Sequence, residues 1–292
     1  MLEFDFLKAE NITDALKYLN RYNKVKLIAG GTDVLVEMHK ENFSNKELNY
    51  LLDISNIKEM KTINKNGDSI EIGALVTHSK LEKSPVINKN INILAQAAVT
   101  IGSTQIRNRG TIGGNLVNAS PAADLLSPLI ALKAIVVLKS VNGKRKLSLA
   151  EFITGPYNTD LKRNEMLTKI IIPNYGEHYY SVFKKIKRRK AVDIARLNMA
   201  VVTKLDKKDR FEDIRIVPGS ATPSPQSFSE IEDELEGSNI HNLEYNKLTK
   251  KIAEEMVSIT GKRWSTPYKK PAVGSLLKKS LKAIIKEVEV NG

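Results

Sequence analysis

Apolar residues in the first half of the chain alternate between helical and strand-like spacing. Segment 12–19 repeats apolar residues three and four positions apart, behind Asn11 or Thr13, either of which can cap a helix. Segment 25–29 is a short apolar run that predicts a strand ending at a pair of glycines, and a helix or turn should follow at 32–38. Together these elements indicate an α+β or α/β domain. Further strands are predicted at 50–54, 69–74, 134–138 and 166–172, and helices at 91–99 and 122–133.

Two breaks divide the rest of the chain. The segment 100–115 is polar and rich in glycine, and it predicts a connection without regular structure. The break Pro-Asn-Tyr-Gly at 173–176 predicts a domain boundary, which gives domains at 1–175 and 176–292. Beyond it the pattern predicts an antiparallel meander followed by helices. The strands are predicted at 180–187, 197–205 and 211–217, and the helices at 226–236, 244–260 and 272–288.

Composition removes several kinds of chemistry. The 292 residues include no cysteine, and the four histidines show neither HExxH spacing nor any other close pairing. Disulfides, thiolate nucleophiles, cysteine-ligated zinc and cysteine-held iron–sulfur clusters are therefore excluded within this chain. No metal site is predicted.

Charge and hydropathy limit the partners and the location. The net charge of +13 is spread along the chain, without zinc-finger spacing or an RNP-like motif, so we expect no nucleic-acid ligand. A lysine-rich surface toward solvent or toward acidic partner subunits is the simpler interpretation. The acidic start MLEFDFLKAE is not an export signal, and the most apolar segment, 125–138, is interrupted by Pro128 and Lys133. We expect no membrane span and a cytoplasmic protein.

Two glycine pairs carry the candidate chemistry. One lies in AGGTD at 29–33, after a predicted strand, and the other in TIGGN at 111–115. Bare backbone at such turns lets N–H groups converge on a phosphate, and a positive φ at Gly114 would be a second reason for glycine there. Each pair taken alone is weak evidence for a phosphate site and is more typical of an ordinary tight turn. Neither fits the P-loop or the GxGxxG pattern.

With IRNRG before the second pair and NASPAADLLSP after it, the two motifs closely resemble the FAD-binding subunit of the molybdenum hydroxylases, the xanthine dehydrogenase and carbon monoxide dehydrogenase family. The resemblance implies an α+β fold. It places first an FAD-binding domain of two α/β subdomains, of the vanillyl-alcohol-oxidase type, at about 1–58 and 59–175. A C-terminal domain with a three-stranded antiparallel sheet and helices follows.

The resemblance also implies the residues around non-covalent FAD. Both glycine loops would clasp its pyrophosphate, and further positions would lie along the cofactor. The first clasp comprises Leu27, Ile28, Ala29, Gly30, Gly31, Thr32, Asp33 and Val34. The second comprises Gly110, Thr111, Gly113, Gly114 and Asn115, and the further positions are Ile101, Gly102, Asn118, Asp124, Leu167 and Lys184.

Three of these positions have a second interpretation. Asp124 matches an aspartate that binds the cofactor, and its second interpretation is an acid favoured at a helix N-terminus. Leu167 could pack on the cofactor or belong to the core. Lys184 matches a lysine near the flavin ring, where a positive charge stabilises reduced flavin, but it could also be one more exposed lysine of a basic run.

The function that the resemblance implies is electron transfer. A partner subunit with the molybdenum cofactor would oxidise the substrate, an iron–sulfur subunit with two [2Fe–2S] clusters would pass on the electrons, and FAD on this chain would deliver them to NAD or another acceptor. Xanthine or a related purine is the first prediction for the substrate. Carbon monoxide, nicotinate and aromatic acyl-CoA dehydrogenases are alternatives, and a stand-alone flavin oxidase or an FAD-free scaffold is a weaker one. The basic loop 184–196 is predicted either to bind the acceptor or tune the flavin through Arg188 and Arg189, or to be a solvated turn or subunit contact.

Overall fold

The computed structural model describes residues 3–40, 48–176, 178–187 and 195–291. Its first unit is a small parallel sheet, β1-β3-β2, in which α1 joins β1 to β2. The Asn11 side chain caps α1 by accepting a hydrogen bond from the Asp14 N–H at 2.9 Å, and Leu16 and Leu19 are buried. The elements are β1 (Asp5–Lys8), α1 (Ile12–Arg21), β2 (Val25–Ile28), α2 (Val34–Met38) and β3 (Tyr50–Asp53).

A five-stranded antiparallel sheet follows, in the order β4-β5-β10-β6-β7. Two of its hairpins turn at glycines with positive φ, Gly67 at 56° and Gly143 at 139°, each directly after an asparagine. The strands are β4 (Ile63–Asn66), β5 (Ser69–Gly73), β6 (Ile135–Ser140), β7 (Gly143–Ser148) and β10 (Met166–Pro173). A short insertion before β10 contains α9 (Leu149–Phe152), β8 (Ile153–Gly155) and β9 (Asn158–Thr159).

Six short helices connect β5 to β6. The prediction of an irregular connection over 100–115 is wrong, because this segment holds α6 and the start of α7. Ser103 and Thr111 begin these helices with side chains that accept from backbone N–H groups. Both helices are too short and too polar to show an apolar period. The six helices are α3 (His78–Lys83), α4 (Pro85–Asn90), α5 (Ile93–Ala98), α6 (Thr104–Arg109), α7 (Ile112–Asn118) and α8 (Leu126–Ala131).

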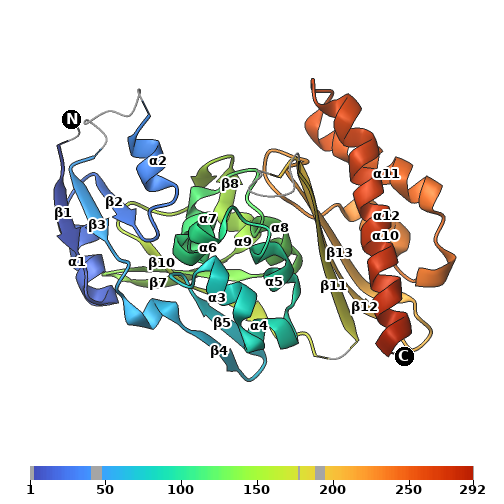
Figure 1. The fold of residues 1–292 in the computed structure, drawn as a ribbon, viewed down its shortest axis with the longest axis horizontal. Coiled ribbons are helices and arrows are strands. Elements are labelled where there is room, and N and C mark those ends of the chain that lie inside the picture. Colours follow the sequence, from blue (N-terminus) through green and yellow to red (C-terminus); the bar gives the residue numbers. More distant parts are fainter. Residues whose placement is uncertain (1–2, 41–47, 177, 188–194, 292) are drawn as a thin grey trace.

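The C-terminal part is an antiparallel three-stranded sheet in the order β11-β12-β13, with helices packed on one face. Figure 1 shows α11 and α12 on the outer side of this sheet, and the first domain on its other side. The prediction of an α+β fold ending in such a sheet with helices is confirmed. The elements are β11 (Tyr179–Ile186), β12 (Leu197–Leu205), β13 (Phe211–Gly219), α10 (Ser229–Leu235), α11 (Tyr245–Thr260) and α12 (Thr266–Asn291).

The C-terminal sheet contributes to two hydrophobic cores. Phe183 of β11 and Val202 of β12 belong to the large core of the first domain. Val182 and Val201, their neighbours in sequence, belong to the core under α11 and α12. Because side chains alternate along a strand, each strand faces both cores, and one face of the sheet closes onto the first domain. No helix within the described ranges is both long and apolar enough to cross a membrane.

Candidate functional site

The two glycine loops lie in direct backbone contact. A Cβ added at Gly30 would lie 2.0 Å from the carbonyl oxygen of Arg109 and 3.1 Å from the nitrogen of Gly110. The loops are also joined by side chains, since Asn118 Nδ2 donates to Asp33 Oδ1 at 3.0 Å. The structure therefore brings the two motifs together, although about eighty residues of sequence separate them.

The first loop presents a series of unused donors. In the part of the chain that the structure describes, the backbone N–H groups of Gly30, Gly31, Thr32 and Asp33 donate to no protein oxygen. Gly31 has a φ of 79°, which favours glycine, and the loop is only partly buried. Successive free N–H groups on a turn can converge on an anion.

The second loop is different, because the first N–H groups of α7 already bind protein oxygens. Gly113 is packed tightly, since a Cβ there would lie 2.7 Å from both Cβ and O of Ala74. Gly114 is exposed, its φ is not positive, and a Cβ there would approach only the Thr111 hydroxyl, at 3.1 Å. The expectation of a positive φ at Gly114 is thus wrong, because this residue lies inside a helix. The N–H bonds run from Ile112 to Val76 O (2.9 Å), from Gly113 to Ala74 O (2.8 Å) and from Gly114 to Thr111 Oγ1 (3.1 Å).

Two buried polar atoms near the second loop lack a protein partner. One is Oδ1 of Asn115, and the other is Nδ1 of His78. The His78 ring is 3% exposed and lies behind Gly110, whose carbonyl accepts from the His78 N–H at 3.0 Å. Burial, with a smaller effect of Arg107, lowers the pKa of His78 to about 4, so the ring is neutral at pH 7. Sequence reasoning missed His78.

The turn at Ile101 and Gly102 is held from inside by Arg107. Its guanidinium donates to the carbonyl of Ile101 at 3.2 Å and of Gly102 at 3.4 Å, and it pairs with Glu82 at 3.1 Å. Gly102 has a φ of 45°, so the turn needs glycine. Arg107 was visible only as part of IRNRG, and nothing in that motif indicated which carbonyls it binds.

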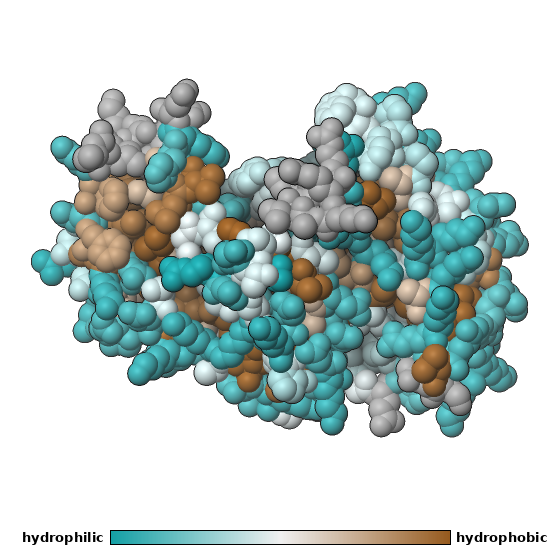
Figure 2. Space-filling view, viewed as in Figure 1, coloured by the Kyte–Doolittle hydropathy of each residue, from teal (hydrophilic) through white to brown (hydrophobic). Residues whose placement is uncertain are grey.

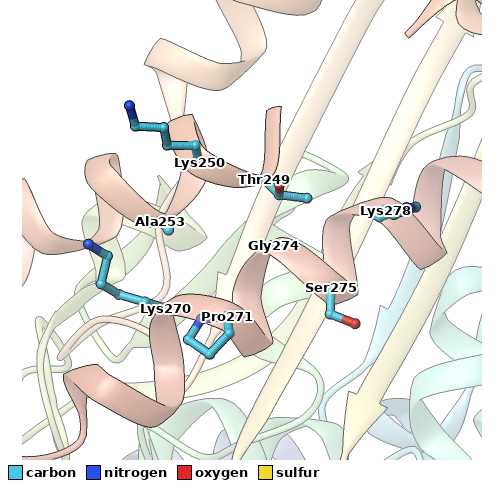
Figure 3. A pocket seen from close by; sticks show the side chains of 8 residues that line it. All are labelled: Thr249, Lys250, Ala253, Lys270, Pro271, Gly274, Ser275 and Lys278. Atoms are coloured by element: carbon cyan, nitrogen blue, oxygen red, sulfur yellow. The ribbon is translucent and has the colours of Figure 1, made fainter. Parts of the chain in front are cut away.

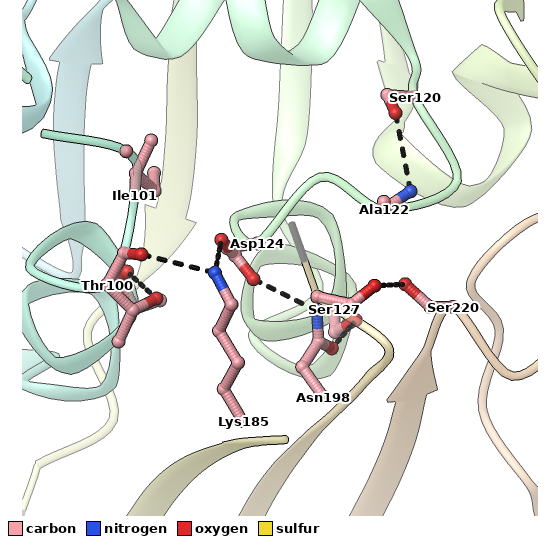
Figure 4. A network of polar contacts seen from close by, with 12 residues as sticks. Thr100, Ile101, Ser120, Ala122, Asp124, Ser127, Lys185, Asn198 and Ser220 are labelled. Carbon is pink, nitrogen blue, oxygen red and sulfur yellow. Dashed lines mark hydrogen bonds and ion pairs between the residues drawn. The ribbon is translucent and has the colours of Figure 1, made fainter. Parts of the chain in front are cut away.

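Asp124 anchors a polar network between the two domains (Figure 4). Its carboxylate pairs with Lys185 Nζ at 2.6 Å, and both side chains are nearly inaccessible, at 7% and 3% exposure. Asn198 Nδ2 donates to the other carboxylate oxygen at 3.4 Å, and Ser127 donates to Asn198 Oδ1 at 2.8 Å. Burial raises the pKa of Asp124, and the ammonium of Lys185 opposes that rise. Asp124 makes no helix-capping bond, because α8 begins after Leu125, whose side chain does not cap it.

Lys184 and Leu167, which were predicted to lie along the cofactor, have side chains in other surroundings. Lys184 is on the face of β11 that also carries Val182, a residue of the core under α11 and α12, so it points away from Asp124. The following residue, Lys185, makes the contact with Asp124. Leu167 is 4% exposed and belongs to the core of the first domain, opposite Leu138 in the sheet. Cofactor contacts of Lys184 and Leu167 stay predictions.

The surface is hollowed where these parts meet. Figure 2 shows a notch between the lobe that carries α2 and the lobe that carries α11 and α12, and Figure 1 places α6 and α7 at its floor. A separate shallow groove of about 460 Å³ runs between α11 and α12 (Figure 3). It is lined by Lys250, Lys270 and Lys278 in the C-terminal domain, and it contains no residue of the two loops. Arg188 and Arg189 of the predicted basic loop lie outside the described residues.

The donor set of the notch fits a dinucleotide with a pyrophosphate. Free N–H groups on one loop lie beside a second loop that exposes bare backbone at Gly114. Backbone donors without intervening side chains bind phosphate oxygens well. The described residues around the loops include no arrangement of nucleophile and base that would point instead to hydrolytic chemistry.

Known proteins are similar to this chain over nearly its whole length. Residues 2–175 match the family described as the FAD binding domain in molybdopterin dehydrogenase, and residues 181–284 match the CO dehydrogenase flavoprotein C-terminal domain. The nicotinate dehydrogenase FAD-subunit of Eubacterium barkeri is 32% identical, covering 99% of this chain and 98% of its own. The glyceraldehyde dehydrogenase medium chain of Sulfolobus acidocaldarius is 30% identical, covering 97% and 98%.

The fold is similar to that of a solved structure. In the carbon monoxide dehydrogenase of Hydrogenophaga pseudoflava that lacks the Mo-pyranopterin moiety of the molybdenum cofactor, one chain superposes with a TM-score of 0.87. The sequences are 28% identical, and the superposition covers 97% of this chain and 98% of that chain.

Proposed function

This chain belongs to the FAD-binding medium subunits of the molybdenum hydroxylase family, and we propose that it is the electron-transfer subunit that links the complex to its terminal acceptor. It would receive electrons from a partner subunit with two [2Fe–2S] clusters and pass them to NAD or another acceptor. A further partner with the molybdenum cofactor would oxidise the substrate. The chain has no cysteine, so it holds no cysteine-ligated cluster of its own.

The observation that carries this proposal is the contact between two unlike glycine loops. The free N–H groups from Gly30 to Asp33 would bind the pyrophosphate of FAD, and the bare surface of Gly114 would let it approach. Asn115 and Asn118 offer amides at the same place, and Asn118 already fixes Asp33. Because Gly30 has no Cβ atom, the two loops can lie close enough to bind one ligand together.

The ring end of the cofactor would lie toward the C-terminal sheet. Lys185 of the second domain bonds there to Asp124 and to the carbonyl oxygen of Thr100, which precedes Ile101 and Gly102, and Asn198 also bonds to Asp124. Bound FAD supplies the exchange between single electrons and electron pairs. The chain's residues bind and orient it, and they exclude water through the buried Asp124 network, without acid–base chemistry on an organic substrate.

The substrate of the complex belongs to the molybdenum subunit. Relatives named for nicotinate and for glyceraldehyde match this chain at 32% and 30% identity. A purine such as xanthine stays the first prediction from the sequence, and this chain by itself favours none of these substrates.

The test is to purify the full chain and record its visible spectrum, then precipitate it with acid and assay the supernatant for FAD. We expect a yellow protein that releases its FAD, because the absence of cysteine excludes a cysteinyl link and no histidine lies in either loop. A colourless chain that takes up no added FAD would support the scaffold alternative. Oxidation of xanthine or nicotinate by the chain alone would support a stand-alone oxidase.

A further inference from the structure

We propose that Lys185 is a positioning residue of the FAD site, which ties the C-terminal sheet to the ring end of the cofactor and neutralises Asp124 there. The proposal rests on the proposed function, since it places the flavin ring beside Asp124. It differs from the prediction for Lys184, which lies on the opposite face of the same strand.

The contacts of Lys185 cross the domain interface (Figure 4). Its ammonium comes from β11 and donates to Asp124 Oδ2 at 2.6 Å and to the carbonyl oxygen of Thr100 at 3.1 Å. Thr100 directly precedes the turn of Ile101 and Gly102, whose carbonyls Arg107 holds from the other side. Two cations therefore clamp this turn, one from each domain.

Burial makes the charge of Lys185 consequential. Both members of the pair are almost fully inaccessible, so removal of the ammonium leaves an uncompensated carboxylate in a medium of low polarity. The charged groups that face Asp124 are Lys185 of β11 and, more weakly, Lys187, which follows the end of that strand. The polar side chain that bonds to Asp124 is Asn198 of β12, which in turn accepts a hydrogen bond from Ser127 of α8.

The interface does not depend on this pair alone. Phe183 N–H donates to Gln96 Oε1 at 2.9 Å, and Arg215 donates to the carbonyl of Ala131 at 2.6 Å. The apolar contacts of Phe183 and Val202 with the first domain also remain. A variant without Lys185 is therefore expected to fold with its domains docked.

A buried anion beside the flavin disfavours the negative charge of the reduced ring, so it should lower the midpoint potential. In Lys185→Met the Asp124 carboxylate loses its counter-ion, and because burial raises its pKa it should take up a proton more readily as the pH falls. The effect on the potential should accordingly be larger at pH 9 than at pH 6. The variant Asp124→Asn leaves an unpaired ammonium and should raise the potential.

The experiment measures FAD affinity and midpoint potential at pH 6 and pH 9 for the full chain and four variants. These are Lys185→Met, Lys184→Met, Asp124→Asn and the double variant Lys185→Met/Asp124→Asn. For Lys185→Met we expect FAD to bind about tenfold more weakly. At pH 9 the reduced cofactor should lose a further tenfold in affinity, which equals about 30 mV for a two-electron couple. The double variant should return to the wild-type potential at both pH values, because no uncompensated charge remains.

The outcomes separate this proposal from the proposed function. If the wild-type chain binds FAD but neither Lys185→Met nor Asp124→Asn moves the potential at either pH, the assignment of Lys185 is wrong and the FAD site stands. A pH-dependent shift in Lys184→Met with none in Lys185→Met would assign the role to Lys184 instead. If the wild-type chain takes up no FAD, the proposed function itself fails. Should Lys185→Met not fold, the double variant and Asp124→Asn still decide the sign of the charge effect.

Discussion

Both glycine loops contain a glycine pair and a threonine, but their backbone N–H groups and glycines are used differently. In the first loop the N–H groups of Gly30 and Gly31 have no acceptor among the described residues, and Gly30 is pressed against the backbone of the second loop. In the second loop the N–H groups are bound, Gly113 is packed into the interior, and only Gly114 is open. The two motifs thus contain glycines in three different settings: one in contact between the loops, one packed in the interior, and one exposed on the surface where we propose that FAD binds.

Replacement of the contact glycine should have the largest effect. In Gly30→Ala the Cβ would lie 2.0 Å from a carbonyl oxygen of the second loop, and neither backbone can yield by moving a side chain. The loops must separate, and we expect FAD affinity to fall more than a hundredfold, about 2.8 kcal/mol. Fluorescence titration with FAD measures this. Gly155→Ala is the matched control, because its Cβ would meet only Asn158 Cβ at 3.8 Å. Equal FAD affinity in both variants would contradict the contact between the loops.

The packing glycine should affect the FAD-free chain instead. In Gly113→Ala the Cβ would lie 2.7 Å from Cβ and O of Ala74, so we expect a loss of about 3 kcal/mol in the free energy of unfolding. Urea denaturation of the chain without FAD measures it. The double variant Ala74→Gly/Gly113→Ala should recover part of the loss, because it removes one of the two clashes. An unchanged unfolding free energy together with lost FAD binding would assign Gly113 to the ligand.

His78 makes the second loop sensitive to acid. Its pKa in the folded chain, about 4, is below the usual 6.5, so below pH 6.5 the unfolded chain gains a proton that the folded chain does not. Stability is then lost as the pH falls, by about 1 to 2 kcal/mol between pH 6.5 and pH 5. Burial raises the pKa of Glu232 to about 7, and this shift acts in the opposite direction. The quantity to compare is therefore the difference in the free energy of unfolding between the wild type and a variant of His78.

Urea denaturation of wild type and His78→Gln at the two pH values tests this prediction. The difference between them should shrink or reverse as the pH falls, because the variant has no histidine to protonate. His241→Gln, at an exposed position, is the control and should follow the wild type. Parallel curves for wild type and His78→Gln would show that His78 does not carry the acid sensitivity.

The sequence predicted the elements best where apolar runs are long. Strand β12 was predicted at 197–205 and is observed at Leu197–Leu205, because apolar residues at 197, 199–202 and 205 mark a strand with apolar side chains on both faces. Helices α6 and α7 were missed because their lengths and polar residues leave no period to detect. Local patterns of apolar residues identify elements that bury apolar surface. Short helices such as these depend instead on side-chain caps to N–H groups three residues further on, and those caps leave no apolar pattern.

The site was predictable as a set of motifs but not as a set of contacts. The resemblance implied that the two loops share a ligand, and the structure brings Gly30 to the backbone of Arg109. The choice between Lys184 and Lys185 depends on which face of β11 meets the first domain, and no residue near them in sequence decides that. His78 bonds to the backbone of Gly110, far along the chain, and Arg107 bonds to two carbonyls across a turn. A pattern of residue types does not reveal such contacts.

The smallest effect is expected at the exposed glycine, Gly114, where the effects on stability and on FAD binding should differ. In Gly114→Ala the Cβ meets only the Thr111 hydroxyl, and alanine favours a helix over glycine by up to about 1 kcal/mol. The FAD-free chain should therefore stay within about 1 kcal/mol of wild type, since the helical gain and a weakened Thr111 cap offset each other. FAD binding should weaken severalfold, and in Gly114→Val more than in Gly114→Ala, because a larger side chain occupies more of the space beside the phosphates. Urea denaturation without FAD and fluorescence titration with FAD give the two quantities. If both variants bind FAD as tightly as wild type, Gly114 does not face the cofactor, and the second loop serves only to support the first.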